Sequence, residues 1–450
     1  MPLRPPTAPR PLPLLYADLE RSGRFLEIAK RSLDMGPSVG GVYRHWHTLR
    51  HLSPPEGLTS EEWWAALKMA RLPLRREIPL LDVAGRPFWF ALPDEALRMI
   101  QGVNLDLGGH VGLPDNTLSP ERRERYLFSS LAEEAITSSQ LEGAATTRDA
   151  AKEMLRTRRS PRDEGEQMVV NNYHAMERVR EIRAERLTPA LVLELQRIVT
   201  DETLPPSEQG LRRPGRDDDV GVYAGGRLLH RPPPAEELES RLEVMCAFAN
   251  DPGDTGPFVP PVARAILLHF WLAYDHPFVD GNGRTARALF YWGMLNQGFW
   301  LAEYLSISRI IYSGKSRYGR SFLYTESDGN DVTYFLLNQL RVVERSIEGL
   351  KAFVQRKGEE MQRARALLRP DASLNHRQVA LLGHALKHPG RLYTVKSHQT
   401  SHGVSTLTAR KDLLGLVGAG FLEQRRLPRR GGPLGFTAPR DLPDRLAESG

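Results

Sequence analysis

The strongest restriction on the fold is a series of helical patterns that fills the middle of the chain. Helical composition and apolar spacing recur at residues 121–142, 187–201, 235–250, 262–274, 283–297 and 332–355. A single short hairpin is expected among them, at residues 220–231 around Gly225 and Gly226. Because helices dominate this part of the chain, we expect a mainly α fold.

Composition excludes several classes of protein. The single cysteine, Cys246, excludes an intramolecular disulfide framework and a zinc site built from several thiolates, and it fits a reducing, cytoplasmic location. The longest apolar stretch, residues 263–274, contains Arg264 and His269 and is shorter than the roughly 18 apolar residues of a membrane span. Six prolines among the first 14 residues predict an extended tail rather than a signal peptide. We therefore expect a soluble protein with no membrane partner.

The chain length leaves room for two or three domains. Shifts in pattern predict an N-terminal region at 1–115, a helical region at 116–160, a helical core at 161–355 and a separate module at 370–440. In the last module, helices at 376–387 and 405–418 precede a two-stranded segment that contains Phe421, Arg429, Arg430 and Phe436. This order is typical of a winged helix-turn-helix.

Positive charge is concentrated near the C-terminus. Residues 351–450 contain 18 Lys and Arg against 8 Asp and Glu, whereas the chain as a whole has a formal charge of only +6. Such a surplus suits DNA as a partner, but winged helices also dock proteins, and basic residues on a hairpin are often merely solvated.

The residues that point to chemistry form one stretch from His276 to Arg287, with the sequence HPFVDGNGRTAR. Gly281 and Gly283 allow the backbone to curl so that its N–H groups converge on a phosphate, and the following helix adds its positive end. Arg284 and Arg287 stand in the first turn of that helix, where each opposes the helix dipole by about 0.3–1 kcal/mol unless an anion is bound. The stretch therefore predicts an anion site.

Two side chains in the stretch suit phosphate chemistry. Asp280 offers a hard oxygen ligand for Mg²⁺ beside the predicted phosphates. His276, with an ordinary pKa of about 6.5, is able to accept a proton from an attacking hydroxyl.

The stretch resembles the signature of the Fic family, which specifies His, Phe, Asp or Glu, Gly, Asn, Gly, Arg and Arg at fixed spacing, and all eight positions match. The resemblance implies a Fic-type helical bundle and a Mg²⁺-dependent enzyme that transfers AMP from ATP to a hydroxyl of a target protein. It implies His276 as the general base and Asp280 as the metal ligand. The residues it implies for nucleotide binding are Gly281, Asn282, Gly283, Arg284, Thr285, Ala286 and Arg287.

An upstream segment, SSQLEG from Ser138 to Gly143, resembles the inhibitory motif of the same family. Ser138 and Glu142 are four residues apart and so share one helix face. The resemblance implies that Ser138, Glu142 and Gly143 form an N-terminal inhibitory helix, in which Glu142 pairs with Arg287 and keeps the γ-phosphate of ATP from its productive position. Without that role, Glu142 is an ordinary solvated residue at a helix end.

Two weaker resemblances concern substrate binding. The start of the hairpin, Val220, Gly221, Val222 and Tyr223, resembles the flap that clamps a target segment by strand addition, although a plain surface hairpin has the same pattern. Tyr318 resembles a family tyrosine close to the adenine, but a tyrosine in a helix is more often part of a core.

Several functions stay open at this level. The same site would also suit removal of AMP or transfer of another phosphate-containing group. A DNA-binding regulator that only senses ATP and an interaction scaffold are further alternatives. The sequence does not determine the oligomeric state, and a homodimer is one alternative.

Overall fold

The computed structural model describes residues 4–108, 120–217, 219–251, 253, 256–366, 374–426, 434–442 and 445–446. The chain forms two compact units. Unit 1 comprises Met1–Val111, Glu134–Ala145 and Asp163–Ser346, and unit 2 comprises Gly112–Glu133, Thr146–Arg162 and Ile347–Gly450. Two helices, α6 (Pro120–Leu141) and α15 (Thr333–Ala366), contribute residues to both.

Unit 1 is built almost entirely from helices, as predicted. Its helices are α1 (Leu12–Arg21), α2 (Phe25–Met35), α3 (Trp46–Leu49), α4 (Ser60–Arg71), α5 (Asp94–Leu107), α8 (Glu164–Glu181), α9 (Pro189–Val199), α10 (Leu238–Asn250), α11 (Pro261–Asp275), α12 (Asn282–Asn296), α13 (Ile307–Ser313) and α14 (Lys315–Ser327). Its strands form two separate antiparallel hairpins, β1 (Arg76–Leu81) with β2 (Pro87–Phe90) and β3 (Val222–Ala224) with β4 (Arg227–His230).

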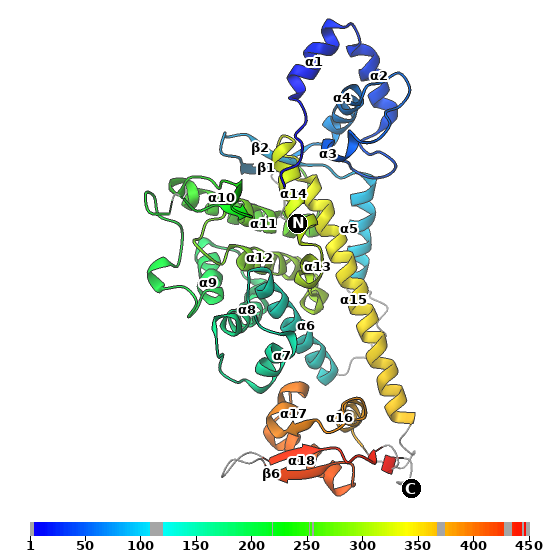
Figure 1. The fold of residues 1–450 in the computed structure, drawn as a ribbon, viewed down its shortest axis with the longest axis vertical. Helices are drawn as coiled ribbons and strands as arrows, with labels where there is room; N and C mark the ends of the chain where they lie inside the picture. Colours follow the sequence, from blue (N-terminus) through cyan, green and yellow to red (C-terminus); the bar gives the residue numbers. More distant parts are fainter. Residues whose placement is uncertain are drawn as a thin grey trace. The chain divides into compact units, whose positions relative to one another are not determined.

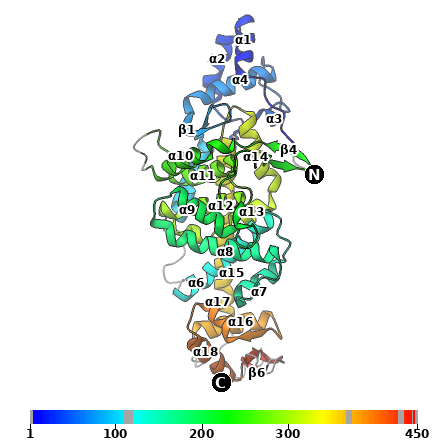
Figure 2. The ribbon, with the colours of Figure 1, turned by 90° about the vertical axis from the view of Figure 1, so that its left-hand side faces the viewer.

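The core of unit 1 is centred on α11 and α12. In both views α12 lies between α11 and α8 (Figure 1 and Figure 2). The two central helices approach closely where Gly293 faces Ala265, because a Cβ on Gly293 would come within 3.0 Å of the Ala265 Cβ. The largest buried side chains of this core include Phe270, Trp271 and Trp292. Helix α12 is thus held on several sides, which fixes the position of its N-terminus.

The N-terminal helices form a smaller cluster within unit 1. A capping box starts α4, since the Thr59 side chain accepts from the Glu62 backbone N–H and the Glu62 side chain accepts from the Thr59 backbone N–H. One expectation for this region was wrong in part, and one element was not predicted. The proline-rich tail becomes helical at Leu12, because Pro11 and Pro13 suit the entry and first turn of a helix. The β1–β2 hairpin was missed, because its short strands carry no extended alternation.

The described part of unit 2 contains helix α7 (Arg148–Thr157) and a C-terminal group of elements. The group consists of α16 (His376–Lys387), β5 (Leu392–Thr394), α17 (Val395–His402), α18 (Thr406–Gly418), β6 (Glu423–Arg426) and β7 (Leu434–Thr437). The strands form an antiparallel sheet in the order β5-β7-β6. Leu413, Leu416 and Phe436 are among the side chains of its buried core. Sequence patterns had predicted α16, α18 and the two last strands, but not α17 or β5.

The first turn of α18 is open to solvent. Thr406, Leu407, Arg410 and Lys411 are all exposed. Arg429 and Arg430, expected on the hairpin, lie outside the described residues. The assignment as a winged helix and the binding of DNA stay predictions, as does the cytoplasmic location. Among the residues that the structure describes, no helix has the length and apolarity needed to cross a bilayer.

Candidate active site

The predicted base lies at the end of the central helix. Helix α11 ends at His276, whose backbone adopts the left-handed conformation with φ 45° and ψ 53° and donates its N–H to the Leu272 carbonyl at 3.0 Å. A residue other than glycine rarely adopts this conformation, so it is held by its surroundings. Asn282 holds the loop that follows, because its side chain accepts from the Phe278 N–H at 3.0 Å and donates to the Phe278 carbonyl at 2.8 Å. Phe278 is fully buried and anchors the loop in the core.

The local geometry restricts the two glycines of the stretch in different ways. Gly281 has φ 88°, and a Cβ there would lie 2.9 Å from the Thr200 side chain and 3.1 Å from that of Val199. At Gly283, in the first turn of α12, a Cβ would collide with the carboxylate of Glu142. The carboxylate therefore lies directly against the N-terminus of α12, where backbone N–H groups and the helix dipole favour an anion.

Arg287 fixes this carboxylate in place. Its guanidinium donates to the Glu142 side chain at 2.8 Å, to the Ser138 hydroxyl at 2.8 Å and to the Ser138 carbonyl at 3.1 Å. The Arg287 side chain is only 3% exposed, whereas that of Glu142 is 33% exposed. Glu142 thus neutralises the buried guanidinium of Arg287, which is 145 residues away in the sequence, and Ser138 binds the same group. Gly143 follows with φ 102° and ends the helix.

Arg284 is used differently from Arg287. It is buried, and its guanidinium donates to the Val199 carbonyl at 2.5 Å and to the Asp280 carboxylate at 2.7 Å. The Thr285 and Ala286 side chains are also buried. In this arrangement Arg284 ties the loop to the end of α9.

Asp280 has the properties of a ligand for a nucleotide-bound metal. Its side chain is half exposed, and only one carboxylate oxygen is bonded to Arg284. Within the described residues, no group of three or more His, Cys, Asp or Glu is placed to hold a metal alone. Mg²⁺ bound to nucleotide phosphates needs only one or two carboxylates, so the single Asp280 fits such an ion.

The electrostatic surroundings of His276 favour the neutral imidazole. Burial lowers its pKa to about 4, and the charge of nearby His230 acts in the same direction, while a hydrogen bond to the Ala273 backbone opposes the shift. A neutral ring at physiological pH has a free lone pair, which is what a general base requires.

His230 and Arg212 contact the residues at the end of α11, and neither was predicted from the sequence. His230, at the end of β4, has one ring nitrogen 3.0 Å from the Glu326 carboxylate and the other 2.7 Å from the Tyr274 carbonyl. Arg212 donates to the carbonyls of His276 at 2.9 Å and Pro233 at 2.8 Å. Neither residue has a local signal, because its partners lie far away along the chain.

The pKa values of His230 and His276 are shifted in opposite directions. Burial opposes protonation of His230, but the hydrogen bond and charge of Glu326, the Tyr274 carbonyl and the charge of Asp275 together outweigh it and raise the pKa of His230 above its ordinary value. We expect NMR of ring-labelled histidine at pH 6.5 to show His230 as a cation and His276 as a neutral ring, with His276→Asn used for assignment. Because the pKa of His276 is lower folded than unfolded, its contribution to stability is lost as the pH falls from about 6.5 toward 4. A cationic His276 at pH 6.5 would contradict this description.

The residues predicted to bind substrates lie in two different elements, the β3–β4 hairpin with the residues before it and helix α14. Val220 and Gly221 precede the β3–β4 hairpin, and Val222 and Tyr223 are in β3, with Tyr223 57% exposed. The hairpin itself is confirmed. Tyr318, in α14, bonds through its hydroxyl to His269 of α11 at 2.9 Å.

Comparison with known proteins identifies part of the chain. Residues 186–294, which contain the whole stretch from His276 to Arg287, match the model of the Fic/DOC family. The segment with Glu142 lies outside this match.

Named relatives cover only part of the chain. The protein adenylyltransferase Fic of Nematostella vectensis is 28% identical over 139 residues, which are 30% of this chain and 30% of that protein. Protein adenylyltransferase fic-1 of Caenorhabditis elegans is 35% identical over 85 residues, or 19% of this chain and 16% of that protein. The chain thus spans less than a third of these relatives. A Fic family protein from Desulfovibrio desulfuricans G20 aligns in structure with a TM-score of 0.47 and 19% identity, over 76% of this chain and 96% of that one.

Proposed function

We propose, on the premise that residues 186–294 form a Fic/DOC-family domain, that this protein transfers AMP from ATP to a hydroxyl group of a target protein. One observation carries the proposal. An anion cradle at the N-terminus of α12 stands next to a neutral imidazole at the end of α11. Phosphate binding and proton removal are the two elements that attack of a hydroxyl on a nucleotide requires.

In the proposed reaction His276 is the general base. Its imidazole takes the proton of a Ser, Thr or Tyr hydroxyl, whose oxygen forms a bond to the α-phosphorus of ATP. The bond between the α-phosphorus and its bridging oxygen breaks, and pyrophosphate leaves. The backbone at Gly281–Gly283 binds the phosphates, with Asn282 keeping the loop in shape. Asp280 would hold Mg²⁺, which neutralises phosphate charge when bound.

Glu142 acts as a brake in this proposal. Its carboxylate lies at the N-terminus of α12 and occupies Arg287, the cation that would otherwise bind the γ-phosphate. A nucleotide that enters the site must either displace Glu142 or bind with its γ-phosphate elsewhere, which misaligns the α-phosphate for in-line attack. Ser138 supports the brake because it accepts two hydrogen bonds from the same guanidinium.

The hairpin β3–β4 serves as the flap that positions the target. Arg212, which precedes it, is fixed to the active-site loop through its backbone N–H, 2.8 Å from the Pro277 carbonyl. Strand β3 pairs on one side with β4, so its other edge is available for an extended segment of the target. Tyr318 is proposed to lie close to the adenine.

The test is to identify which part of ATP is transferred. The Glu142→Gly variant is incubated with Mg²⁺ and a cell lysate, using ATP labelled at either the α- or the γ-phosphate. We expect label on protein from α-labelled ATP alone, because the γ-phosphate leaves with pyrophosphate. Label from γ-labelled ATP would identify a phosphoryl transferase, and label from CDP-choline alone a different transferred group. Release of AMP from pre-labelled protein, without new labelling, would favour removal of AMP.

A further inference from the structure

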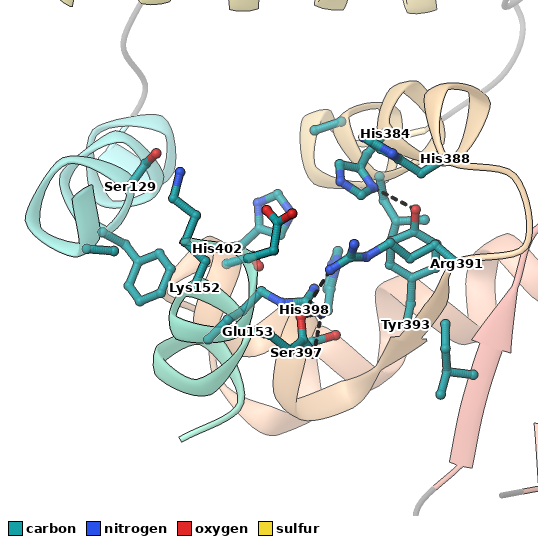
Figure 3. A pocket seen from close by; sticks show the side chains of 18 of the residues that line it. Ser129, Lys152, Glu153, His384, His388, Arg391, Tyr393, Ser397, His398 and His402 are labelled. Carbon is teal, nitrogen blue, oxygen red and sulfur yellow. Dashed lines mark hydrogen bonds and ion pairs between the residues drawn. The ribbon is translucent and has the colours of Figure 1, made fainter. Parts of the chain in front are cut away.

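Unit 2 contains a cavity of about 860 Å³ that is separate from the site described above (Figure 3). Helix α7 lines one side, and α16, α17 and the residues around β5 line the other. Binding sites for small molecules typically have volumes of roughly 300–1,000 Å³. The cavity therefore has the size of a ligand site.

Three cations and two carboxylates line the cavity, and the Lys152 ammonium is also paired with the Glu133 carboxylate at 3.1 Å. The cations Lys152, Arg156 and Arg391 face it together with the carboxylates of Asp149 and Glu153. Glu153 is already shared between Arg156 at 2.8 Å and Arg391 at 3.0 Å. The Nε of Arg156 is buried and has no hydrogen-bond partner among the described residues.

Four imidazoles also line the cavity, of which His398 is bonded to the Asp412 carboxylate at 3.2 Å. His384 and His388 have ring centroids 4.4 Å apart, and His398 and His402 have theirs 4.5 Å apart. In Figure 3 both pairs and Arg391 lie around the same space. Despite this number of histidines, the described residues include no group of three or more His, Cys, Asp or Glu that could hold a metal ion. The chemistry of the cavity suits an anion rather than a cation.

The remaining wall combines a group of apolar side chains with Ser129, Ser397 and Ser401. Phe128, Leu381 and Leu392 line it, and the Tyr393 hydroxyl is bonded to His384 at 2.7 Å. An inorganic ion would leave this wall without a contact, whereas an organic body would cover it. We propose that the cavity binds a small organic anion, a carboxylate or a phosphate ester, whose charged group is held by Lys152, Arg156 and Arg391. The anion competes with Glu153 for Arg391, which links α7 to the C-terminal group of elements.

The test measures binding and does not depend on transferase activity. Citrate and glucose 6-phosphate, as a carboxylate and a phosphate ester, are titrated into the full chain by calorimetry, with sodium chloride at matched ionic strength as the blank. We expect saturable 1:1 binding of at least one probe. Arg391→Ala and Lys152→Ala should each weaken it at least tenfold. Arg440→Ala, which removes an exposed arginine of the same unit outside the cavity, should leave the affinity within twofold.

Three results would overturn the proposal. The first is that neither probe shows saturable binding above the blank. The second is that Arg440→Ala weakens binding as much as Arg391→Ala does, since the effect would then reflect overall charge. The third is binding that survives both Arg391→Ala and Lys152→Ala unchanged, which would place the probe outside this cavity. Melting temperatures establish that the variants are folded, and Lys152→Met serves if Lys152→Ala is not.

Discussion

Replacing His276 by alanine in the Glu142→Gly background is expected to lower AMP transfer by about 10²- to 10⁴-fold, the usual contribution of a positioned general base. The imidazole stands at the end of α11 with a lowered pKa, so it is neutral and ready to accept a proton. Without it, the target hydroxyl must lose its proton to water during attack. The measurement is the initial rate of label transfer from α-labelled ATP.

Two further variants separate chemistry from folding. His276→Asn keeps a residue that tolerates the left-handed conformation, and it should be as inactive as the alanine variant. His51→Ala removes an exposed histidine elsewhere in unit 1 and should retain full activity. ATP binding should persist in all three variants. A rate for His276→Asn within threefold of its parent would remove His276 from the role of base.

Removal of the brake should have the second largest effect. We expect Glu142→Gly to raise the rate of AMP transfer at least tenfold over the wild type, which corresponds to about 1.4 kcal/mol in the activation barrier. The carboxylate lies against Gly283 and neutralises Arg287, so its loss opens the anion cradle and frees the guanidinium. The same label-transfer assay measures the gain.

The gain should follow the charge of residue 142. Glu142→Gln keeps the length of the side chain but removes its charge, so we expect an activity between those of the wild type and Glu142→Gly. Glu185→Gly, which changes an exposed glutamate after a short helix, should leave the rate unchanged. Equal rates for the wild type and Glu142→Gly, both well above background, would show that the pair does not inhibit. If Glu142→Gly bound ATP no differently but transferred faster, the brake would act on alignment rather than on affinity.

The fold class followed from the sequence because helical spacing is a local property. The six helices expected in the middle of the chain are all present, and their ends agree to within a few residues except for α15, which extends beyond residue 355. Helix α8 was not predicted, since buried polar residues such as Asn171 and Asn172 interrupt its apolar pattern. The two hairpin segments differed for a similar reason. Gly225 and Gly226 predict a tight turn, whereas β1 and β2 are short and of mixed composition.

The candidate site also has one part that was predicted from the sequence and one part that was not. A continuous stretch from His276 to Arg287 contains the helix end, the left-handed residues and the start of the next helix, so its sequence alone predicted the loop that joins α11 to α12 and a histidine at its start. Which side chains face the anion and which hold the loop was decided by packing. Arg284 is buried against Val199 and Asp280, whereas Arg287 reaches Ser138 and Glu142.

Tertiary structure alone decided the contacts that join distant segments. These contacts depend on residues separated by tens to hundreds of positions. They are the hydrogen bond from Arg212 to the His276 carbonyl, the contact of His230 with Glu326, and the lining of the cavity in unit 2. Local sequence patterns arise from hydrogen bonds and side-chain spacing within a few residues of one helix or turn. Pairing across the molecule depends instead on how helices pack against one another. The sequence by itself therefore determined most of the central helices and the loop between α11 and α12, and packing determined which side chains surround that loop.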